Sequence, residues 1–181
     1  MMSAQQRYHS ASILMHWLMF ILLIAVYSCI ELRELYSKGS EPREALKSWH
    51  FTLGLSVFAL VWVRLVVRLI TQTPVINPVL AKWQTALAKI GHFCLYLLMI
   101  IMPIGGWLIL SAEGSPITFW GLALPSLISE DLELATTIEE LHETAGVFGY
   151  YLIGLHAVIA LFHHYVRKDN TLSRMLPIKL R

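Results

Sequence analysis

The chain has 181 residues, of which 56% are hydrophobic and only 14% are charged, and its formal net charge at pH 7 is +2. Soluble domains carry about 25% charged residues, so the composition excludes an ordinary soluble protein. The sequence has no block of basic residues of the kind that binds nucleic acid.

Four apolar segments are long enough to cross a bilayer, which takes about 20 residues in a helix. We expect transmembrane helices over about residues 13–31, 48–70, 90–112 and 141–167, within a single domain over 1–181. Short polar stretches separate these segments, and no repeat or soluble domain is apparent. The sequence therefore predicts an all-α membrane protein folded as a bundle of four transmembrane helices.

The positions of lysine and arginine predict the orientation, because short cytoplasmic flanks of membrane helices are enriched in both. One side takes both ends of the chain and ten of the fourteen basic residues, which are Arg7, Arg64, Arg68, Lys82, Lys89, Arg167, Lys168, Arg174, Lys179 and Arg181. Among them lies one acid, Asp169, whereas the loops of the other side hold the remaining acidic residues. We therefore expect both termini in the cytoplasm.

Histidines are concentrated in the apolar segments, where polar side chains are costly and usually functional. Seven lie in or beside them: His16, His50, His92, His142, His156, His163 and His164. His142 and His156 are fourteen residues apart, so on a helix they share a face and lie about 21 Å apart along the axis. His50 begins the second segment outside, and His16 lies near the inner start of the first. We expect His50 to pair with His142, and His16 with His156.

Two imidazoles that face each other across a bundle can bind one haem iron from both sides. Closing both axial positions favours electron transfer over oxygen binding. The spacing leaves one alternative open, because His163 lies on the same face as His156 and could partner His16 instead.

Other residues fit this interpretation. Arg64 and Arg68 share a helix face near the cytoplasmic end, where Arg64 could bind a haem propionate and Arg68 could reach lipid headgroups. Gly105 and Gly106 would allow close contact with a helix or a flat cofactor. The sequence has no CxxCH motif for covalent haem attachment.

Several stretches resemble the bacterial dihaem cytochrome b561 family, within the prokaryotic cytochrome b membrane domains. They are SILMHWLMF around His16, WHFTLGLSVFALVWVRLVVRL around His50, GHFCLYLL around His92 and LHETAGVFGYYLIGLHAVIALFHHYVRKDNTLSRMLP from His142 onward. The resemblance implies two b haems in a four-helix bundle of the bacterial inner membrane, with His16–His156 and His50–His142 as axial pairs. It also implies quinone as a redox partner, with His92 and His163 as candidate quinone residues, and some members oxidise superoxide at the periplasmic face.

The expected function is thus transmembrane electron transfer through two haems, coupled to quinone. Superoxide oxidation is a further activity, against which the acidic outer loops argue unless Arg33, Arg43 or Lys47 forms a local basic pocket. One alternative is a membrane anchor subunit that relays electrons for a soluble dehydrogenase or hydrogenase as its partner protein. A second is a haem-free metal or proton transporter, which would usually place carboxylates beside the histidines.

Overall fold

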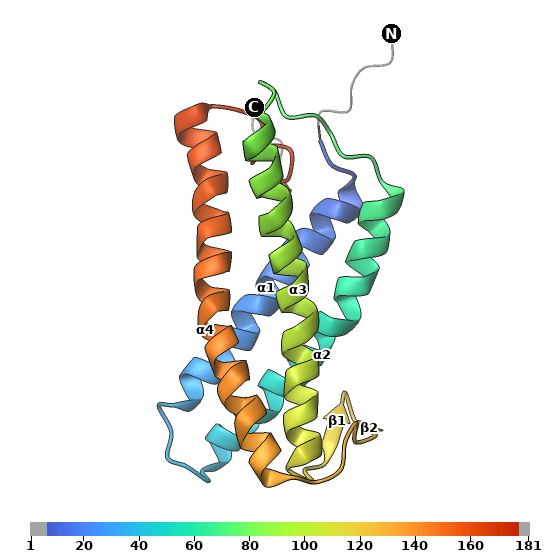
Figure 1. Cartoon of the computed structure of the whole chain (residues 1–181), viewed down its shortest axis with the longest axis vertical. Coiled ribbons are helices and arrows are strands. Elements are labelled where there is room, and N and C mark those ends of the chain that lie inside the picture. Colours follow the sequence, from blue (N-terminus) through green and yellow to red (C-terminus); the bar gives the residue numbers. More distant parts are fainter. Residues whose placement is uncertain (1–6, 178–181) are drawn as a thin grey trace.

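Four long helices and one small hairpin make up the protein, whose computed structural model describes residues 7–177 (Figure 1). The helices are α1 (Ser10–Arg33), α2 (Glu41–Ile70), α3 (Lys82–Ala112) and α4 (Leu132–Phe162). Between α3 and α4, strands β1 (Ile117–Phe119) and β2 (Leu122–Leu124) pair antiparallel, and α4 runs on into a π-helical turn, His163–Arg167.

All four helices are long and apolar enough to cross a membrane. The predicted all-α bundle of four membrane-spanning helices is therefore confirmed. Large apolar side chains point outward along the helices, as Leu14 (67% exposed) and Tyr151 (73%) do. Such a surface is typical of contact with lipid rather than water. α2 and α4 begin before the predicted apolar segments, at Glu41 and Leu132. The first turn of α2 is polar, and the part of α4 before residue 141 carries three glutamates.

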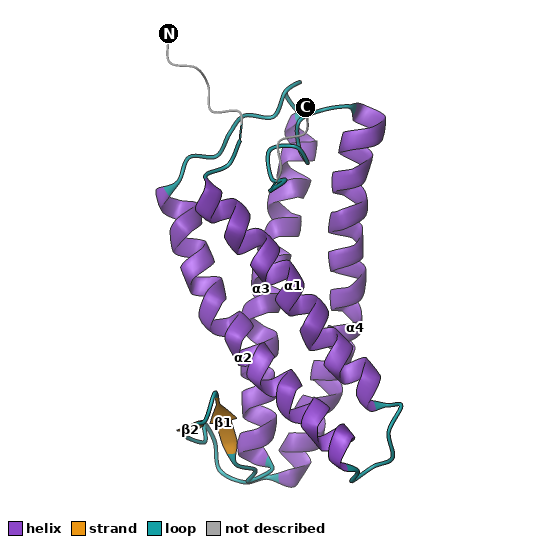
Figure 2. Ribbon diagram, turned by 180° about the vertical axis from the view of Figure 1, so that it is seen from behind, coloured by secondary structure: helices purple, strands orange, loops and turns teal. Residues whose placement is uncertain are grey.

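The helices form two pairs, as the views from front and back show (Figures 1 and 2). α1 packs along α2, α3 packs along α4, and contacts between α2 and α3 join the pairs. Within residues 7–177, no Cα atom of α4 lies within 8 Å of a Cα atom of α1 or α2. An interval therefore separates α4 from the α1–α2 pair, and only side chains reach across it.

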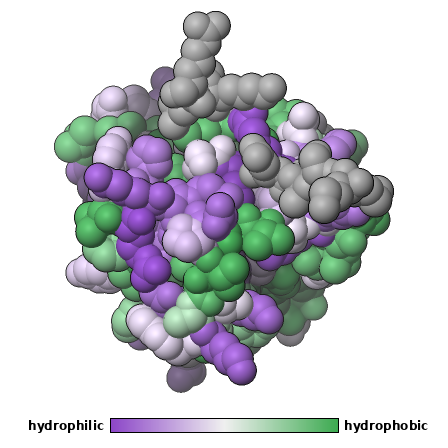
Figure 3. Space-filling view, turned by 90° about the horizontal axis from the view of Figure 1, so that it is seen from above, coloured by the Kyte–Doolittle hydropathy of each residue, from purple (hydrophilic) through white to green (hydrophobic). Residues whose placement is uncertain are grey.

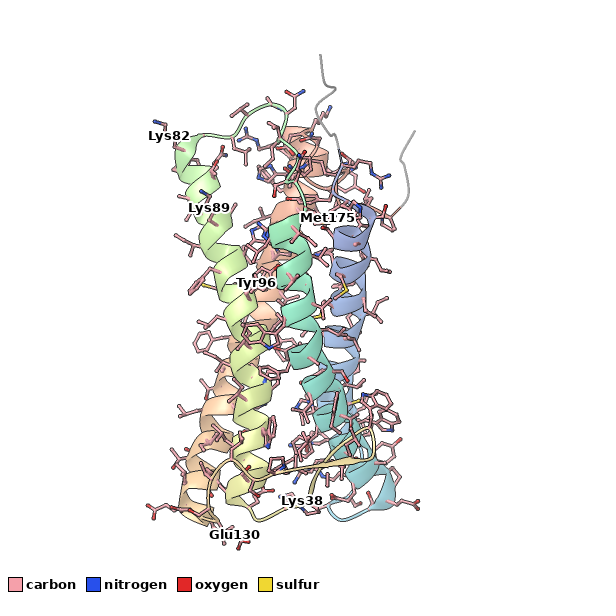
Figure 4. The ribbon with its side chains drawn as sticks, turned by 90° about the vertical axis from the view of Figure 1, so that its right-hand side faces the viewer. Lys38, Lys82, Lys89, Tyr96, Glu130 and Met175 are labelled. Carbon is pink, nitrogen blue, oxygen red and sulfur yellow. The ribbon has the colours of Figure 1, made fainter. Side chains whose placement is uncertain are left out.

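Both ends of the described chain lie at one end of the bundle, here called the terminal end, and the opposite end is the hairpin end. Figure 4 places Lys82 and Met175 at the terminal end, and Lys38 and Glu130 at the hairpin end. Seen from the terminal end, hydrophilic residues cross the middle and hydrophobic residues lie around them (Figure 3). Lys179 and Arg181, two of the basic residues expected on the cytoplasmic side, lie outside the described residues.

A dry core holds α1, α2 and α3 together at mid-length. It is built on Met19, Val57, Val61 and Met99, which are almost completely buried. Lipid is as apolar as these side chains, so their close packing stabilises the bundle through van der Waals contact rather than through exclusion of water.

The hairpin folds back onto α2. Trp120 at its turn donates a hydrogen bond from Nε1–H to Ser56 Oγ (3.1 Å), and its ring meets that of Trp49 edge to face at 5.9 Å. Positive φ angles at Trp120 (49°) and Gly121 (84°) make the tight turn possible.

Residues 168–177 fold across the terminal end and link α1 to the loop between α2 and α3. The Trp17 indole N–H donates to Met175 O (2.8 Å), and Asn170 Oδ1 accepts from the Asn77 N–H (2.8 Å). Buried Asp169 accepts from His163 Nδ1–H at 2.5 Å and from the Thr171 N–H at 2.9 Å. Burial by itself would raise the pKa of Asp169, but these hydrogen bonds outweigh it and hold the pKa below its ordinary value.

A depressed pKa in the folded state means that ionised Asp169 stabilises the protein above its unfolded pKa of about 3.9. This stabilisation is lost as the pH falls through the lower, folded-state pKa. We expect hydrogen-exchange protection factors in residues 168–177, which correct for the pH dependence of intrinsic exchange, to fall on acidification below about pH 4. In Asp169→Asn the protection factors should be lower already at pH 7 and should change less with pH. Asp131→Asn, at the hairpin end, is the control and should behave as wild type in this segment; an unchanged acid response in Asp169→Asn would contradict the assignment.

Candidate functional site

His50 on α2 and His142 on α4 face each other across the interval near the hairpin end and form the hairpin-end pair. Their ring centroids lie 6.3 Å apart. His50 Nδ1–H donates to the carbonyl of Val26 on α1 (3.0 Å), which leaves Nε2 with a free lone pair. Metal-bound histidines usually donate their second ring N–H in this way. His142 Nδ1 is buried and meets no hydrogen-bond partner among the described residues.

A cavity of about 410 Å³ lies beside the hairpin-end pair. Both imidazoles line it, together with Gly54 of α2 and Gly106 of α3. A Cβ atom at Gly54 would meet no atom within 4 Å, whereas one at Gly105 would lie only 3.1 Å from His142 Nδ1. The absence of a side chain at Gly54 thus leaves room in front of the pair on α2. Its absence at Gly105 lets His142 approach the backbone of α3.

Charged side chains surround the same cavity near the hairpin end, and acids outnumber bases among them. The acids are Glu31, Glu34, Glu113, Glu139 and Glu143, and the bases are Arg33 and Lys47. Arg33 Nε lies 3.1 Å from Glu34 Oε1, and Lys47 Nζ lies 4.0 Å from Glu113 Oε2. Arg43, the third base expected to form a local basic pocket, also binds Glu34 (2.8 Å).

Three imidazoles meet nearer the terminal end and form the terminal-end cluster. His16 of α1 and His156 of α4 have ring centroids 6.3 Å apart, the same distance as in the hairpin-end pair. His92 of α3 lies 5.4 Å from His156, and its Nδ1–H donates to Ala88 O one turn earlier (2.6 Å). Helices from both sides of the interval therefore contribute to the cluster.

Arg64 on α2 extends the terminal-end cluster. Its Nη2 donates to His16 Nδ1 (3.0 Å), and its guanidinium carbon lies 5.7 Å from the centre of the Tyr96 ring. A guanidinium has no acceptor, so Nδ1 of His16 must accept in this arrangement. Arg64 also lines a small cavity together with Arg68 and Ser12.

The spacing in the sequence left both His156 and His163 open as partners of His16, and the structure gives them different surroundings. His156 faces His16, whereas His163 is buried against Asp169 of the C-terminal tail. His164 stacks on the neighbouring Tyr165, with ring centroids 4.8 Å apart. Sequence reasoning missed the Val26 carbonyl, because a backbone acceptor leaves no mark on the residue type.

A model of the prokaryotic cytochrome b561 family matches residues 7–177, which is the whole described chain. The chain belongs to the prokaryotic cytochrome b561 family. The resemblance seen in the sequence is thereby confirmed, and membership in a cytochrome b family implies haem b. It also places the protein among membrane electron-transfer proteins.

Similar proteins match this chain over almost its full length. "Probable superoxide oxidase CybB" of Yersinia pestis is 38% identical over 174 residues, which are 96% of this chain and 98% of that protein. "Cytochrome b561 homolog 1" of Escherichia coli (strain K12) is 33% identical over 171 residues, with 94% and 97% covered. "Cytochrome b561 homolog 2" of the same organism is 28% identical over 172 residues, with 94% and 92% covered.

The histidines fit haem iron as ligand groups. Two imidazoles that bind one metal ion from opposite sides, with bonds of about 2 Å as at zinc, have ring centres about 6 Å apart. Both pairs match this value, at 6.3 Å. The unpartnered His142 Nδ1 and the glycine-lined cavity fit the same kind of flat, metal-containing group.

Proposed function

We propose that this cytochrome b561 transfers electrons across the membrane through two haem b groups and exchanges them with quinone. One observation carries the proposal: two histidine pairs with the same ring separation of 6.3 Å span the same interval. One member of each pair lies on α4, and the two are about 21 Å apart along its axis. Two ligand sites at two depths suit a relay across a bilayer of about 30 Å.

His50 with His142, and His16 with His156, are the proposed axial ligands. Bound in this way, haem supplies a one-electron iron couple whose potential the protein sets. At the hairpin end, the Val26 carbonyl engages Nδ1–H of His50 and leaves Nε2 free to bind iron. At the terminal end, Arg64 must turn away from Nδ1 of His16, because a neutral ring that accepts at Nδ1 carries its proton on Nε2. Once turned, Arg64 is placed to bind a propionate.

The core residues between the two clusters exclude water from the route. Met19 and Val61 are 0% and 1% exposed, and they lie on α1 and α2 between the levels of the clusters. An apolar route of this kind would also prevent protons from leaking between the two sites.

We propose that the terminal end faces the cytoplasm of a bacterial inner membrane. Lys82 and Lys89 lie at the terminal end, whereas Glu130 lies at the hairpin end (Figure 4). This charge distribution agrees with the enrichment of basic residues on the cytoplasmic side.

Quinone is proposed to react at the terminal end, beside His92 and His163. The Nδ1 atoms of both rings are already engaged, by Ala88 O and by Asp169 Oδ2. Their Nε2 atoms are thus left to accept a hydrogen bond from a quinol hydroxyl.

Superoxide oxidation at the hairpin end is a second candidate activity. The name of the Yersinia pestis relative supports it, and Arg33 and Lys47 line the hairpin-end cavity as the cations that an anion would meet. Each superoxide would give one electron and leave as O₂, and two electrons with two protons would convert quinone to quinol.

Removal of one ligand should release one haem. We expect His50→Ala or His142→Ala to halve the haem content of purified protein, and His16→Ala or His156→Ala to remove the other haem. The pyridine haemochrome assay gives haem per chain, and redox-dependent spectra show which component is missing. His164→Ala, outside both pairs, should keep full content. Full haem retention in any of the four ligand variants would rule out that residue as a ligand.

Filling the hairpin-end cavity should act like the loss of its ligands. Gly54→Leu places a side chain in open space in front of the histidines, and we expect it to lower haem content toward one per chain. Gly91→Leu is the matched control, since it is also helical and also unobstructed but does not line this cavity. If the two variants had equal haem content, haem would not occupy this cavity.

Stopped-flow mixing distinguishes the electron donors. We expect oxidised protein to develop reduced b-type bands within milliseconds after mixing with quinol. If superoxide is also a substrate, it should produce the same bands, and Lys47→Gln should slow that reaction, more so at low salt. Superoxide dismutase in the syringe is the control and should abolish only the superoxide reaction. Reduction by quinol alone would leave electron transfer intact and reject superoxide as donor.

A further inference from the structure

We infer that charges fixed in the protein make the terminal-end site the preferred location of the electron, and that Arg64 is the residue chiefly responsible. The inference rests on the proposed function, since it concerns the relative potentials of two haems. It assigns Arg64 a role that the sequence did not suggest, namely tuning of the electron equilibrium between the sites.

Arg64 is a half-buried cation that forms no ion pair within residues 7–177. It is only partly accessible, and its Nη2 reaches the ring of a proposed ligand, His16, at 3.0 Å. The ion pairs found within residues 7–177 involve Arg33, Arg43, Lys47 and His163, and none includes Arg64. Since arginine stays protonated in proteins, Arg64 gives the terminal-end cluster a positive charge. Haem carries propionates at either site, so this charge remains a difference between the two sites even where Arg64 binds one of them.

The hairpin-end site has the opposite environment. Five carboxylates and two basic side chains line its cavity, which gives a formal charge of 2 − 5 = −3. Both basic groups also lie within 4.0 Å of a carboxylate, which offsets their field. The two proposed haem sites therefore differ in the sign of the charge around them.

A haem iron that gains an electron loses one unit of positive charge. A nearby cation therefore favours the reduced state and raises the potential, whereas nearby carboxylates favour the oxidised state and lower it. These effects are strong within a lipid-buried bundle, where the effective dielectric constant is far below that of water. Turning of Arg64 from His16 toward the small cavity that it shares with Arg68 would keep the charge at the same end.

One consequence concerns the direction of transfer. An electron that enters at the hairpin end lowers its free energy by moving to the terminal end, so that one site is oxidised as the other is reduced. The charges thus favour transfer toward the end where quinone is proposed to react.

A redox titration of the purified dihaem protein, followed by visible spectroscopy, tests the inference. Comparison with His142→Ala, which should retain only the terminal-end haem, assigns the two midpoint potentials. We expect the terminal-end haem to have the higher potential in wild type. Arg64→Gln should lower it by about 59 mV, which is a tenfold change for a one-electron couple, and should leave the hairpin-end potential unchanged.

Three variants separate charge from structure. Arg64→Lys keeps the charge but loses the planar donor group, so it should retain most of the wild-type potential. Arg68→Gln removes the same charge one turn away, where it is exposed, and should have a smaller effect. The double variant Glu139→Gln/Glu143→Gln should raise the potential of the hairpin-end haem.

Equal potentials in wild type, or an Arg64→Gln shift shared by both haems, would overturn the inference while two haems remain visible. Absence of two haems would instead refute the proposed function, so the two failures are distinguishable. If Arg64→Gln loses the terminal-end haem, the potential in Arg64→Lys and the Glu139→Gln/Glu143→Gln shift decide the matter.

Discussion

The interval between α4 and the α1–α2 pair is the constraint on which the rest of the molecule depends. Among the helices of residues 7–177, the backbone of α4 comes close only to that of α3, so the other inward face of α4 meets α1 and α2 through side chains alone. His142 and His156 project from that face toward His50 and His16. A group that binds both members of a pair would connect the two halves of the bundle, so that cofactor binding and folding are thermodynamically coupled.

Charged residues, like the histidines, form two separate groups at the two ends of the bundle. The basic residues from which the orientation is proposed, such as Lys82 and Lys89, lie at the terminal end, and the carboxylates before and along α4 lie at the hairpin end. Exposed charges such as Lys82 and Lys89 are screened over about 10 Å at ordinary ionic strength, so they affect a haem site little unless, like the carboxylates that line the hairpin-end cavity, they lie beside it. Arg64 is different because it is half-buried and its Nη2 lies 3.0 Å from Nδ1 of His16 in the cluster. The uneven placement of charged residues along the sequence can therefore affect both the membrane orientation and the difference between the haem potentials. The two effects can still be separated, because substitution of Arg64 should change the potential alone.

Sequence was sufficient for the four helices and for the placement of the histidines at two depths. Both follow from local rules, because apolar runs mark spans and a helix rises by a fixed amount per residue. The hairpin was not predicted: its turn is Trp120-Gly121, not the Asn-Gly or Asp-Gly that marks such turns. The engagement of His163 by Asp169 and the bond from Trp17 to Met175 depend on where the tail folds, and the latter joins residues 158 positions apart. No local pattern encodes contacts of that kind.

The third imidazole makes the terminal-end cluster chemically different from the hairpin-end pair. His156 has two neighbours, His16 at 6.3 Å and His92 at 5.4 Å between ring centres. Two opposed bonds to one metal ion require about 6 Å, which suits His16 better than His92. His92 also has its Nδ1–H turned to Ala88 O, so its remaining nitrogen can accept a proton or a hydrogen bond. An electron-transfer site needs two ligands, whereas a site that also converts quinone needs a further group that binds protons. The additional histidine at the end nearest Arg64 therefore argues that proton-coupled chemistry belongs at the terminal end.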